Sequence, residues 1–483
     1  MSQSKFYKPI LILLCLALLL GVSQIQRGLN RERAKLGLTR MPPLENAPPI
    51  LAFTTVALGG FRGLISNALW IRANDLQEAD KYFEMVQLAD WITKLEPHFT
   101  LVWINQAWNM AYNISVKFKD PQDRWRWVQR GIALLRDEAL RYNPDDRLIY
   151  RELSWLFQHK MGQNLDDAHQ FYKQAWFEEM NPLVGKRPNY DALLHPKTAE
   201  DNQRAQILRE KYKMDFALMK KVDEKYGPLE WRLPEAHAIY WAELGVIKGK
   251  GEDMEKVHRS IYQTMQQNFR RGALYENKID GSFSLGPNLD AIPNVNKSYE
   301  DPMMQDDEKT RDYPKTGHKN FLKDAVYFLY LYNRRSEAEK WYSYLKEKYP
   351  NAIPDYIKEK FPKANPAAKL SLDEFATLRV TEDVGETDPV KIQAVLGGLI
   401  AKAYLSLAQD DDEAAANYER LAQSVYNRFT ESTKGAGVRV GLPPLKTITE
   451  KVRVELLDPE RGFPPEAAAR LRTKLGLPAP EKK

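Results

Sequence analysis

Four prolines, each at the end of an aromatic-rich and helix-favouring stretch, divide this 483-residue chain into helical units. They are Pro97, Pro144, Pro182 and Pro350, and we expect each one to end a helical hairpin and to start the next helix. A helical hairpin has one apolar face, which it can bury only against a neighbouring hairpin. The regular occurrence of these prolines therefore predicts hairpins that stack into a solenoid.

Side chains of alternating size occupy the positions at which the two helices of one hairpin pack together. In the stretch 69–97, large, small and aromatic positions follow one another as Leu69, Ala73, Leu76, Tyr82 and Ala89. Related orders recur in the stretches 150–182, 322–350 and 399–429. The stretch 100–144 starts like a repeat but contains about a dozen extra residues around 117–126. The stretch 234–268 is expected to be a hairpin because Pro234 suits a first helical turn and Gly249-Lys250-Gly251 suits the bend.

This pattern resembles the tetratricopeptide repeat, a helical hairpin of about 34 residues, over about half of the chain and in degenerate copies. The resemblance implies an all-α fold: a right-handed, TPR-like solenoid of helical hairpins behind an N-terminal transmembrane or signal helix, as in membrane-anchored bacterial proteins. The commonest use of this family is to bind a protein or peptide, so the resemblance implies that function.

Composition narrows the possible partners and chemistry. Eleven Trp, 24 Tyr and 18 Phe in a chain that is 43% hydrophobic indicate a folded protein. The net charge of +6 is spread over interleaved basic and acidic residues without a dense basic patch, so we expect no nucleic-acid partner. Cys15 is the only cysteine, which excludes an internal disulfide and a thiolate metal site.

The N-terminus has the layout of an export signal. Lys5 and Lys8 precede an unbroken apolar run, Ile10–Val22, which is short for a full membrane span. We expect a single-pass signal anchor; a signal peptide cleaved after Ser23 and a buried helix are the alternatives. The export-type layout favours an extracytoplasmic location for the part of the chain that follows the run, which we call the body. The basic residues after the run favour a cytoplasmic location instead: Arg27, Arg31, Arg33, Lys35 and Arg40.

A second apolar stretch, Ile50–Ile71, follows a proline-rich linker. Its central Arg62 would be costly at the middle of a bilayer. We therefore expect this stretch to form the buried first helix of the solenoid and not a second span.

The chain then divides by composition into repeats and interruptions. The interruption Gly272–Asn320 is rich in Gly, Pro, Asn and Asp, which predicts a long irregular loop. A capping box, Ser371 with Glu374, predicts one short helix in a later linker. The expected organisation is 1–26, signal anchor or signal peptide; 27–49, basic linker; 50–270, TPR-like repeats; 271–320, long loop; 321–353, TPR-like hairpin; 354–390, linker with a short helix; 391–430, TPR-like hairpin; and 431–483, short helices and a basic tail.

One local group of side chains could hold a metal ion. His159 ends the first helix of the hairpin 150–182, and Asp166 and His169 open the second. Two imidazoles and a carboxylate form a ligand set of zinc and iron sites. The simpler interpretation, which we adopt, is that Asn164 or Asp166 caps the second helix and the histidines pack among aromatic rings. We therefore predict no metal and no cofactor.

The segment 227–241 is unusually aromatic for a repeat helix, and we expect it to line a partner-binding groove. The groove candidates are Trp231, Arg232, His237 and Tyr240. A further aromatic run at helical spacing indicates core positions, with a sugar or peptide platform as the alternative: Trp103, Trp108, Tyr112, Trp125, Trp127 and Trp155.

The sequence contains no phosphate-binding glycine loop, nucleophile elbow or His-Glu-x-x-His pair. We therefore predict a non-enzymatic scaffold, tethered to a membrane by its N-terminal helix, that holds a partner protein or peptide in a bacterial envelope complex. The alternative is a metal-binding enzyme or an accessory subunit of envelope biogenesis that uses His159, His169 and His237. Partner identity and oligomeric state stay open.

Overall fold

The computed structural model describes residues 4–35, 62–276, 283–305, 312–332, 334–360, 370–384, 389–433, 442–459 and 462–478. Within these ranges the chain is almost entirely helical, and its single sheet is a two-stranded β-hairpin. The predicted all-α class is confirmed. The chain divides into two compact units, Met1–Ile149 and Tyr150–Lys483.

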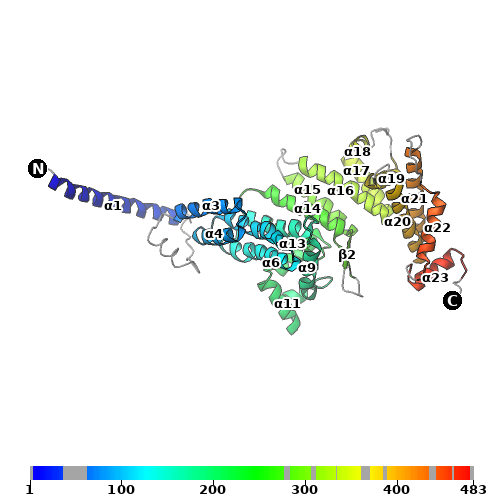
Figure 1. The fold of residues 1–483 in the computed structure, drawn as a ribbon, viewed down its shortest axis with the longest axis horizontal. Coiled ribbons are helices and arrows are strands. Elements are labelled where there is room, and N and C mark those ends of the chain that lie inside the picture. Colours follow the sequence, from blue (N-terminus) through cyan, green and yellow to red (C-terminus); the bar gives the residue numbers. More distant parts are fainter. Residues whose placement is uncertain are drawn as a thin grey trace. The chain divides into compact units, whose positions relative to one another are not determined.

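The first unit begins with the 32-residue helix α1 and continues with shorter helices (Figure 1). Two of these, α5 and α6, run directly into π-helical segments. They are α1 (Ser4–Lys35), α3 (Arg62–Glu78), α4 (Tyr82–Leu95), α5 (Thr100–Trp108), the π-helix η2 (Asn109–Ile114), the 3₁₀-helix η3 (Ser115–Lys117), α6 (Pro121–Ala133), the π-helix η4 (Leu134–Ala139) and α7 (Leu140–Tyr142).

The predicted hairpin 69–97 is present, because α3 packs against α4. Its core contains the expected small and large side chains Ala73 and Leu76 with Met85 and Leu88. The turn after α4 is held at the carbonyl oxygen of Pro97, which accepts hydrogen bonds from two side-chain N–H groups: Trp103 Nε1 at 2.9 Å and Asn143 Nδ2 at 2.8 Å.

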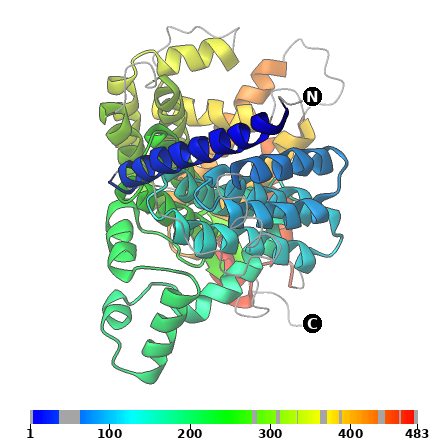
Figure 2. The ribbon, with the colours of Figure 1, turned by 90° about the vertical axis from the view of Figure 1, so that its left-hand side faces the viewer.

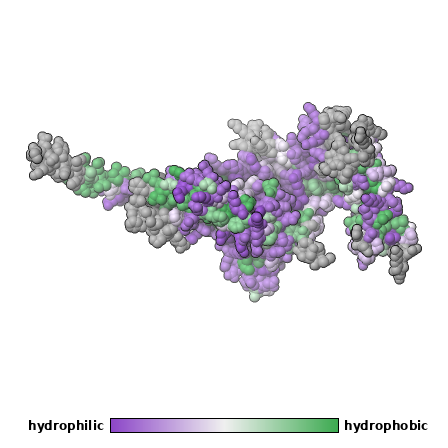
Figure 3. Space-filling view, in the orientation of Figure 1, coloured by the Kyte–Doolittle hydropathy of each residue, from purple (hydrophilic) through white to green (hydrophobic). Residues whose placement is uncertain are grey.

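Helix α1 exposes its apolar side chains along residues 13–29 and is predominantly hydrophobic there (Figure 3). In the part of the chain that the structure describes, no helix is both long and apolar enough to cross a membrane. The linker 36–49 and most of the stretch 50–71 lie outside the described residues. Where α3 is described, Leu64 and Ile71 are exposed, so the expected burial of this helix is wrong for these two side chains.

The second unit begins within the helix that crosses residue 150 and ends at the C-terminal helices. Its elements are α8 (Arg147–Trp155), the π-helix η5 (Leu156–Gly162), α9 (His169–Val184), α10 (Tyr190–Leu194), α11 (Ala199–Glu210), α12 (Phe216–Tyr226), α13 (Pro234–Ile247), α14 (Met254–Arg271), β1 (Ala273–Glu276), β2 (Phe283–Gly286), η6 (Leu289–Ala291), α15 (Ile292–Gln305), α16 (Asp312–Leu331), α17 (Arg335–Lys348), α18 (Ala352–Lys360), α19 (Leu372–Val384), α20 (Pro389–Ala408), α21 (Asp412–Thr433), α22 (Leu445–Leu456) and α23 (Pro465–Lys474).

Most neighbours in this unit are consecutive along the chain. Helix η5 packs on α9, α13 on α14, α16 on α17 and α20 on α21, and these pairs match the predicted hairpins 150–182, 234–268, 322–350 and 399–429 (Figure 1). Helices α10, α11 and α12 form a small group beside α9 and α13 (Figure 2). Pro234 occupies the first turn of α13, as expected for a proline that starts a helix.

Three of the four punctuating prolines lie in turns before a helix: Pro97 before α5, Pro144 before α8 and Pro350 before α18. The prediction for Pro182 is wrong, because this residue lies inside α9. Met180, Leu183 and Val184 are buried around it, and their packing outweighs the backbone hydrogen bond that a proline lacks. Helix α9 ends instead at Gly185, whose φ of 60° favours glycine.

The extra residues between 100 and 144 do not form a loop. They lengthen the first helix through η2 and η3 to Lys117, and α6 begins at Pro121 after an N-cap by Asp120. The Asp120 carboxylate accepts a hydrogen bond from the backbone N–H of Gln122 at 2.9 Å.

The long irregular loop expected for 271–320 is also wrong. This stretch contains the antiparallel pair β1–β2, in register Ala273 to Gly286, and the helix α15. Ile292, Val295 and Tyr299 form a buried apolar face on α15, which packs against α14. The two prolines of α15 and its polar residues conceal this short helical period in the sequence.

The later linker and the C-terminus follow the predictions more closely. The capping box is confirmed: Glu374 N donates to Ser371 Oγ at 3.3 Å, and Ser371 N donates to Glu374 Oε2 at 2.7 Å. It starts α19, and a second short helix, α18, precedes it. The two predicted C-terminal helices are α22 and α23, and both pack on α20.

Candidate functional site

A polar pocket of about 430 Å³ lies between η5 and α14 in the second unit. We call it the glutamine pocket. One indole, five primary amides and two guanidinium groups line it: Trp155, Gln158, Gln163, Gln263, Gln266, Gln267, Arg270 and Arg271. Among the described residues, neither a carboxylate nor an aliphatic side chain contributes to this lining.

Helical spacing explains how the pocket forms. The residues from α14 lie at positions 263, 266, 267, 270 and 271, so they share one face of the helix at three- and four-residue intervals. The facing residues come from the end of α8, from η5 and from the turn that follows η5. A π-helical stretch such as η5 is frequent at functional sites.

Gln158 is the most deeply buried of the lining residues, at 2% exposure. Its Oε1 and that of Gln267 are buried, and neither has a hydrogen-bond partner among the described residues. A buried amide without a partner costs on the order of 1–3 kcal/mol. A water or ligand group that reaches these oxygens and donates hydrogen bonds would recover this free energy.

The two arginines are held by carboxylates that lie outside the pocket lining. Arg270 donates to Asp324 at 2.5 Å, and Arg271 donates from Nε to Glu235 at 3.2 Å. Glu235 is buried, and its other oxygen has no partner within the described part of the chain. The ion pairs fix the guanidinium groups beside the pocket, while the lining itself carries only positive charge.

Trp155 is half-buried, and the His159 ring stacks on it at a centroid distance of 4.5 Å. Gly162 closes the same helix. A Cβ atom at Gly162 would lie 3.1 Å from Phe157 O, 3.3 Å from Gln267 Oε1 and 3.4 Å from Glu235 Oε1, so a larger residue would crowd this position.

The structure does not assemble His159, Asp166 and His169 into a ligand set. Asp166 is engaged by an ion pair with Lys160 and by a hydrogen bond from Ala168 N at 2.9 Å. Burial raises the pKa of Asp166, but the Lys160 hydrogen bond and charge outweigh it and leave the pKa lowered. No group of three or more His, Cys, Asp or Glu side chains in the described ranges could hold a metal ion.

His169 Nδ1 accepts a hydrogen bond from Lys173 Nζ at 3.0 Å, which directs the imidazole towards an ammonium group. Burial, followed by the Lys173 charge, lowers the pKa of His169. Burial also lowers the pKa of His159. His159 stacks on an aromatic ring, as expected, whereas His169 contacts the Lys173 ammonium group. The N-cap of α9 is Ala168 and neither Asn164 nor Asp166, although Asp166 accepts a hydrogen bond from Ala168 N just before the helix.

The four groove candidates of the segment 227–241 do not line a groove. Trp231, Arg232, His237 and Tyr240 are all 0–1% exposed and belong to the core. His237 and Tyr240 are buried because α13 packs against both η5 and α14, and Trp231 and Arg232 lie in the turn just before α13. His237 Nε2 donates to Trp231 O at 2.9 Å, and burial lowers the pKa of His237 to about 4.

Arg232 holds the β-hairpin to this core. Its guanidinium donates to Glu230 at 2.8 Å and to Asn181 at 3.0 Å, and it pairs with Glu276 of β1. It also lies over the Phe177 ring, which contacts Phe283 of β2. The role of Arg232 is thus to position the strands.

Within the first unit, two groups of aromatic side chains stand at the surface. Phe83, Phe118 and Trp127 contact one another from three segments, and Phe83 is 56% exposed. We call them the Phe83 cluster. Leu101, Trp108 and Tyr112 share one helical face and form the Trp108 stripe, in which Trp108 stacks on Tyr112 at 4.3 Å and is 43% exposed.

The residues of the aromatic run therefore divide into buried and accessible positions. Trp103 and Trp125 are buried in the core, as predicted. Trp108 reaches the surface and Trp155 lines the glutamine pocket, so core packing does not account for these two side chains.

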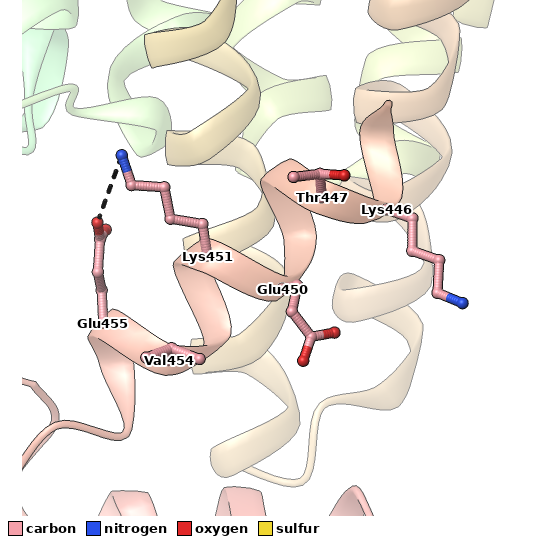
Figure 4. A pocket seen from close by; sticks show the side chains of 6 residues that line it. All are labelled: Lys446, Thr447, Glu450, Lys451, Val454 and Glu455. Atoms are coloured by element: carbon pink, nitrogen blue, oxygen red, sulfur yellow. Dashed lines mark ion pairs between the residues drawn. The ribbon is translucent and has the colours of Figure 1, made fainter. Parts of the chain in front are cut away.

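Two other hollows lack the features of the glutamine pocket. One is a shelf along α22, lined by the side chains in Figure 4, which all project from one helix and include the exposed Val454. The other lies between α16, α18 and α19, where Lys323 and Arg379 are balanced by Glu359 and Glu382. Neither shows a nearly fully buried amide aimed into it.

Sequence reasoning missed the glutamine pocket, although its signal was present. Three glutamines and two arginines recur on one face of a predicted helix, where a solvated face normally carries mixed charges. Only the packing of η5 against α14 brings Gln158 and Gln163 opposite that face. Comparison with protein-family models, with curated proteins and with solved structures finds no match to this chain.

Proposed function

We propose that this protein is a membrane-tethered helical-repeat scaffold, TPR-like in its hairpins, that binds a partner protein in a bacterial envelope complex. The observation that supports it best is the exposed apolar surface of the first unit. Large apolar side chains that stay exposed in a group mark interaction sites, and Trp and Tyr dominate the binding energy of such sites.

The partner face in this proposal is the Trp108 stripe. A half-exposed Trp stacked on a Tyr is already oriented, so little side-chain entropy is lost when a partner covers it. Phe99, the N-cap of the same helix, is also 44% exposed and contacts Trp70 of α3 at a centroid distance of 6.2 Å.

The tether in this proposal is α1. Its leucines at 13, 14, 16, 18, 19 and 20 are all more than half exposed. An apolar helix in this state gains free energy when it enters a lipid or protein environment, at roughly 25 cal/mol per Å² of apolar surface. The apolar run behind Lys5 and Lys8 supports a signal anchor with an extracytoplasmic body, whereas the basic residues after the run favour the opposite side.

Affinity capture from detergent-solubilised membranes of the source cells tests the partner face. The double variant Leu101→Ser with Trp108→Ser should lose the captured partner, while Val454→Ser, at a still more exposed apolar position in the second unit, should retain it. The partner must then bind the purified chain directly. Identical capture by all three forms would contradict the proposed face.

Carbonate extraction of membranes tests the tether. The full chain should stay in the membrane pellet, and a chain without residues 1–35 should appear in the supernatant. A pelleted truncated chain would show that another segment attaches the protein. Protease treatment of intact spheroplasts then reports the side on which the body lies.

A further inference from the structure

We propose that the glutamine pocket is a binding site for an acidic saccharide, a sugar chain that carries carboxylate groups. The pocket lies in the second unit, and this inference is independent of the scaffold function, which rests on the first unit and on α1.

The amides select for a polyhydroxylated ligand. A primary amide offers two donors and one carbonyl acceptor, and a hydroxyl group both donates and accepts. Five such amides line about 430 Å³, a volume suited to a small ligand. The buried Oε1 atoms of Gln158 and Gln267 still require donors, and sugar hydroxyls would supply them.

The absence of an aliphatic lining, among the described residues, favours a sugar over a peptide. Sites that recognise proteins or peptides gain most of their affinity from apolar anchors in apolar pockets. The only apolar surface here is the indole of Trp155. Its electron-rich face suits the C–H face of a pyranose ring, which is weakly positive. One aromatic ring among hydrogen-bonding groups therefore matches a saccharide better.

The arginines make the site selective for acidic sugars. Arg270 and Arg271 stand at the end of α14, and both line the pocket. A guanidinium presents several donors in a planar fork that fits a carboxylate. Asp324 and Glu235 already bind these arginines but are not among the lining residues, so the arginines are held while the described lining carries no negative charge. A ligand carboxylate therefore meets oriented donors.

Isothermal titration of the full chain in detergent tests this site with defined probes. The probes are trigalacturonate, the neutral trisaccharide maltotriose, galacturonate monomer, and the acidic peptide acetyl-Asp-Ser-Asp-Ser-Asp-amide. Trigalacturonate should bind at least tenfold more tightly than maltotriose and the peptide. Tighter binding of the peptide, equal binding of the neutral sugar, or no binding of trigalacturonate at millimolar concentration would overturn the proposal.

Three variants locate the binding. Gln158→Met keeps the volume but removes the amide, and it should weaken trigalacturonate binding about tenfold. Arg270→Gln should reduce the preference for the acidic over the neutral trisaccharide by a similar factor. Gln170→Met, at an exposed position on α9 outside the pocket, is the matched control and should bind as the parent does.

Circular dichroism and thermal unfolding show whether each variant is folded. If folded Gln158→Met and Arg270→Gln bind trigalacturonate as tightly as Gln170→Met, the pocket is not the binding site and the inference fails. Such a failure leaves the partner face untouched, because capture through Trp108 is measured separately.

Discussion

Arg271 Nε donates a hydrogen bond to Oε1 of Glu235 at 3.2 Å, and it does so at the edge of the glutamine pocket. Glu235 is 1% exposed, so its charge must be compensated inside the protein. Lys173, also buried, supplies a second positive charge to this carboxylate. Glu235, Arg271 and Lys173 thus form a charged group beside the pocket, and the protonation of Lys173 can be tested.

Burial lowers the pKa of Lys173 to about 8, although Glu235 acts to raise it. The unfolded chain binds this proton up to about pH 10.4, so between pH 8 and pH 10 the unfolded state holds more protons. The free energy of unfolding should therefore increase by on the order of 1 kcal/mol when the pH rises from 8 to 9.5. Urea unfolding at pH 8 and pH 9.5 measures this increase, and Lys173→Met should abolish it. The same increase in the free energy of unfolding for the parent and the variant would contradict the prediction.

His237 should make the protein sensitive to acid. Its pKa is about 4 in the fold because of burial, against about 6.5 when unfolded, so its contribution is complete above pH 6.5 and is lost as the pH falls towards 4. Between pH 7 and pH 5 the loss is about 2 kcal/mol. His237→Gln, which retains a donor for Trp231 O, should flatten this pH dependence of thermal unfolding. The exposed His195→Gln should leave the slope unchanged.

Arg232 should be among the most sensitive positions in the second unit. Arg232→Met removes the cation that satisfies Glu230 and ties β1 to the core, and leaving a buried partner uncompensated costs about 3–5 kcal/mol. Urea unfolding measures this loss. Hydrogen exchange should also become faster in β1, Ala273–Glu276. Arg126→Met, in an exposed ion pair with Asp123, should change stability by less than about 1 kcal/mol.

The capping box of Ser371 and Glu374 should stabilise the start of α19. Ser371→Ala removes the acceptor for Glu374 N and should destabilise α19 by about 1 kcal/mol. Faster amide exchange in the first turn of α19 is the expected readout. In a double-mutant cycle with Glu374→Ala the two losses should not add, since the residues bind each other; full additivity would show that the reciprocal pair is not stabilising.

The helices themselves could be predicted because their signals are local. Small and aromatic side chains at hairpin spacing identified the pairs α3–α4, α16–α17 and α20–α21. Pro234 and the glycine-rich bend 249–251 identified α13–α14, and the Ser371 cap located α19. Local rules failed where packing competes with them. Pro182 stays within α9 because the apolar residues around it are buried, and α15 forms because Ile292, Val295 and Tyr299 find a partner in α14.

The sequence by itself determined the all-α class, most of the hairpins and the apolar N-terminal run, because each depends on residues close together in the chain. Only the tertiary structure decided which polar residues face one another. The expected groove residues Trp231 and His237 became core, whereas Gln158 and Gln267 came to share a pocket. Residues about 100 positions apart meet there only because η5 and α14 both pack against α13, a relationship that helical periodicity does not encode.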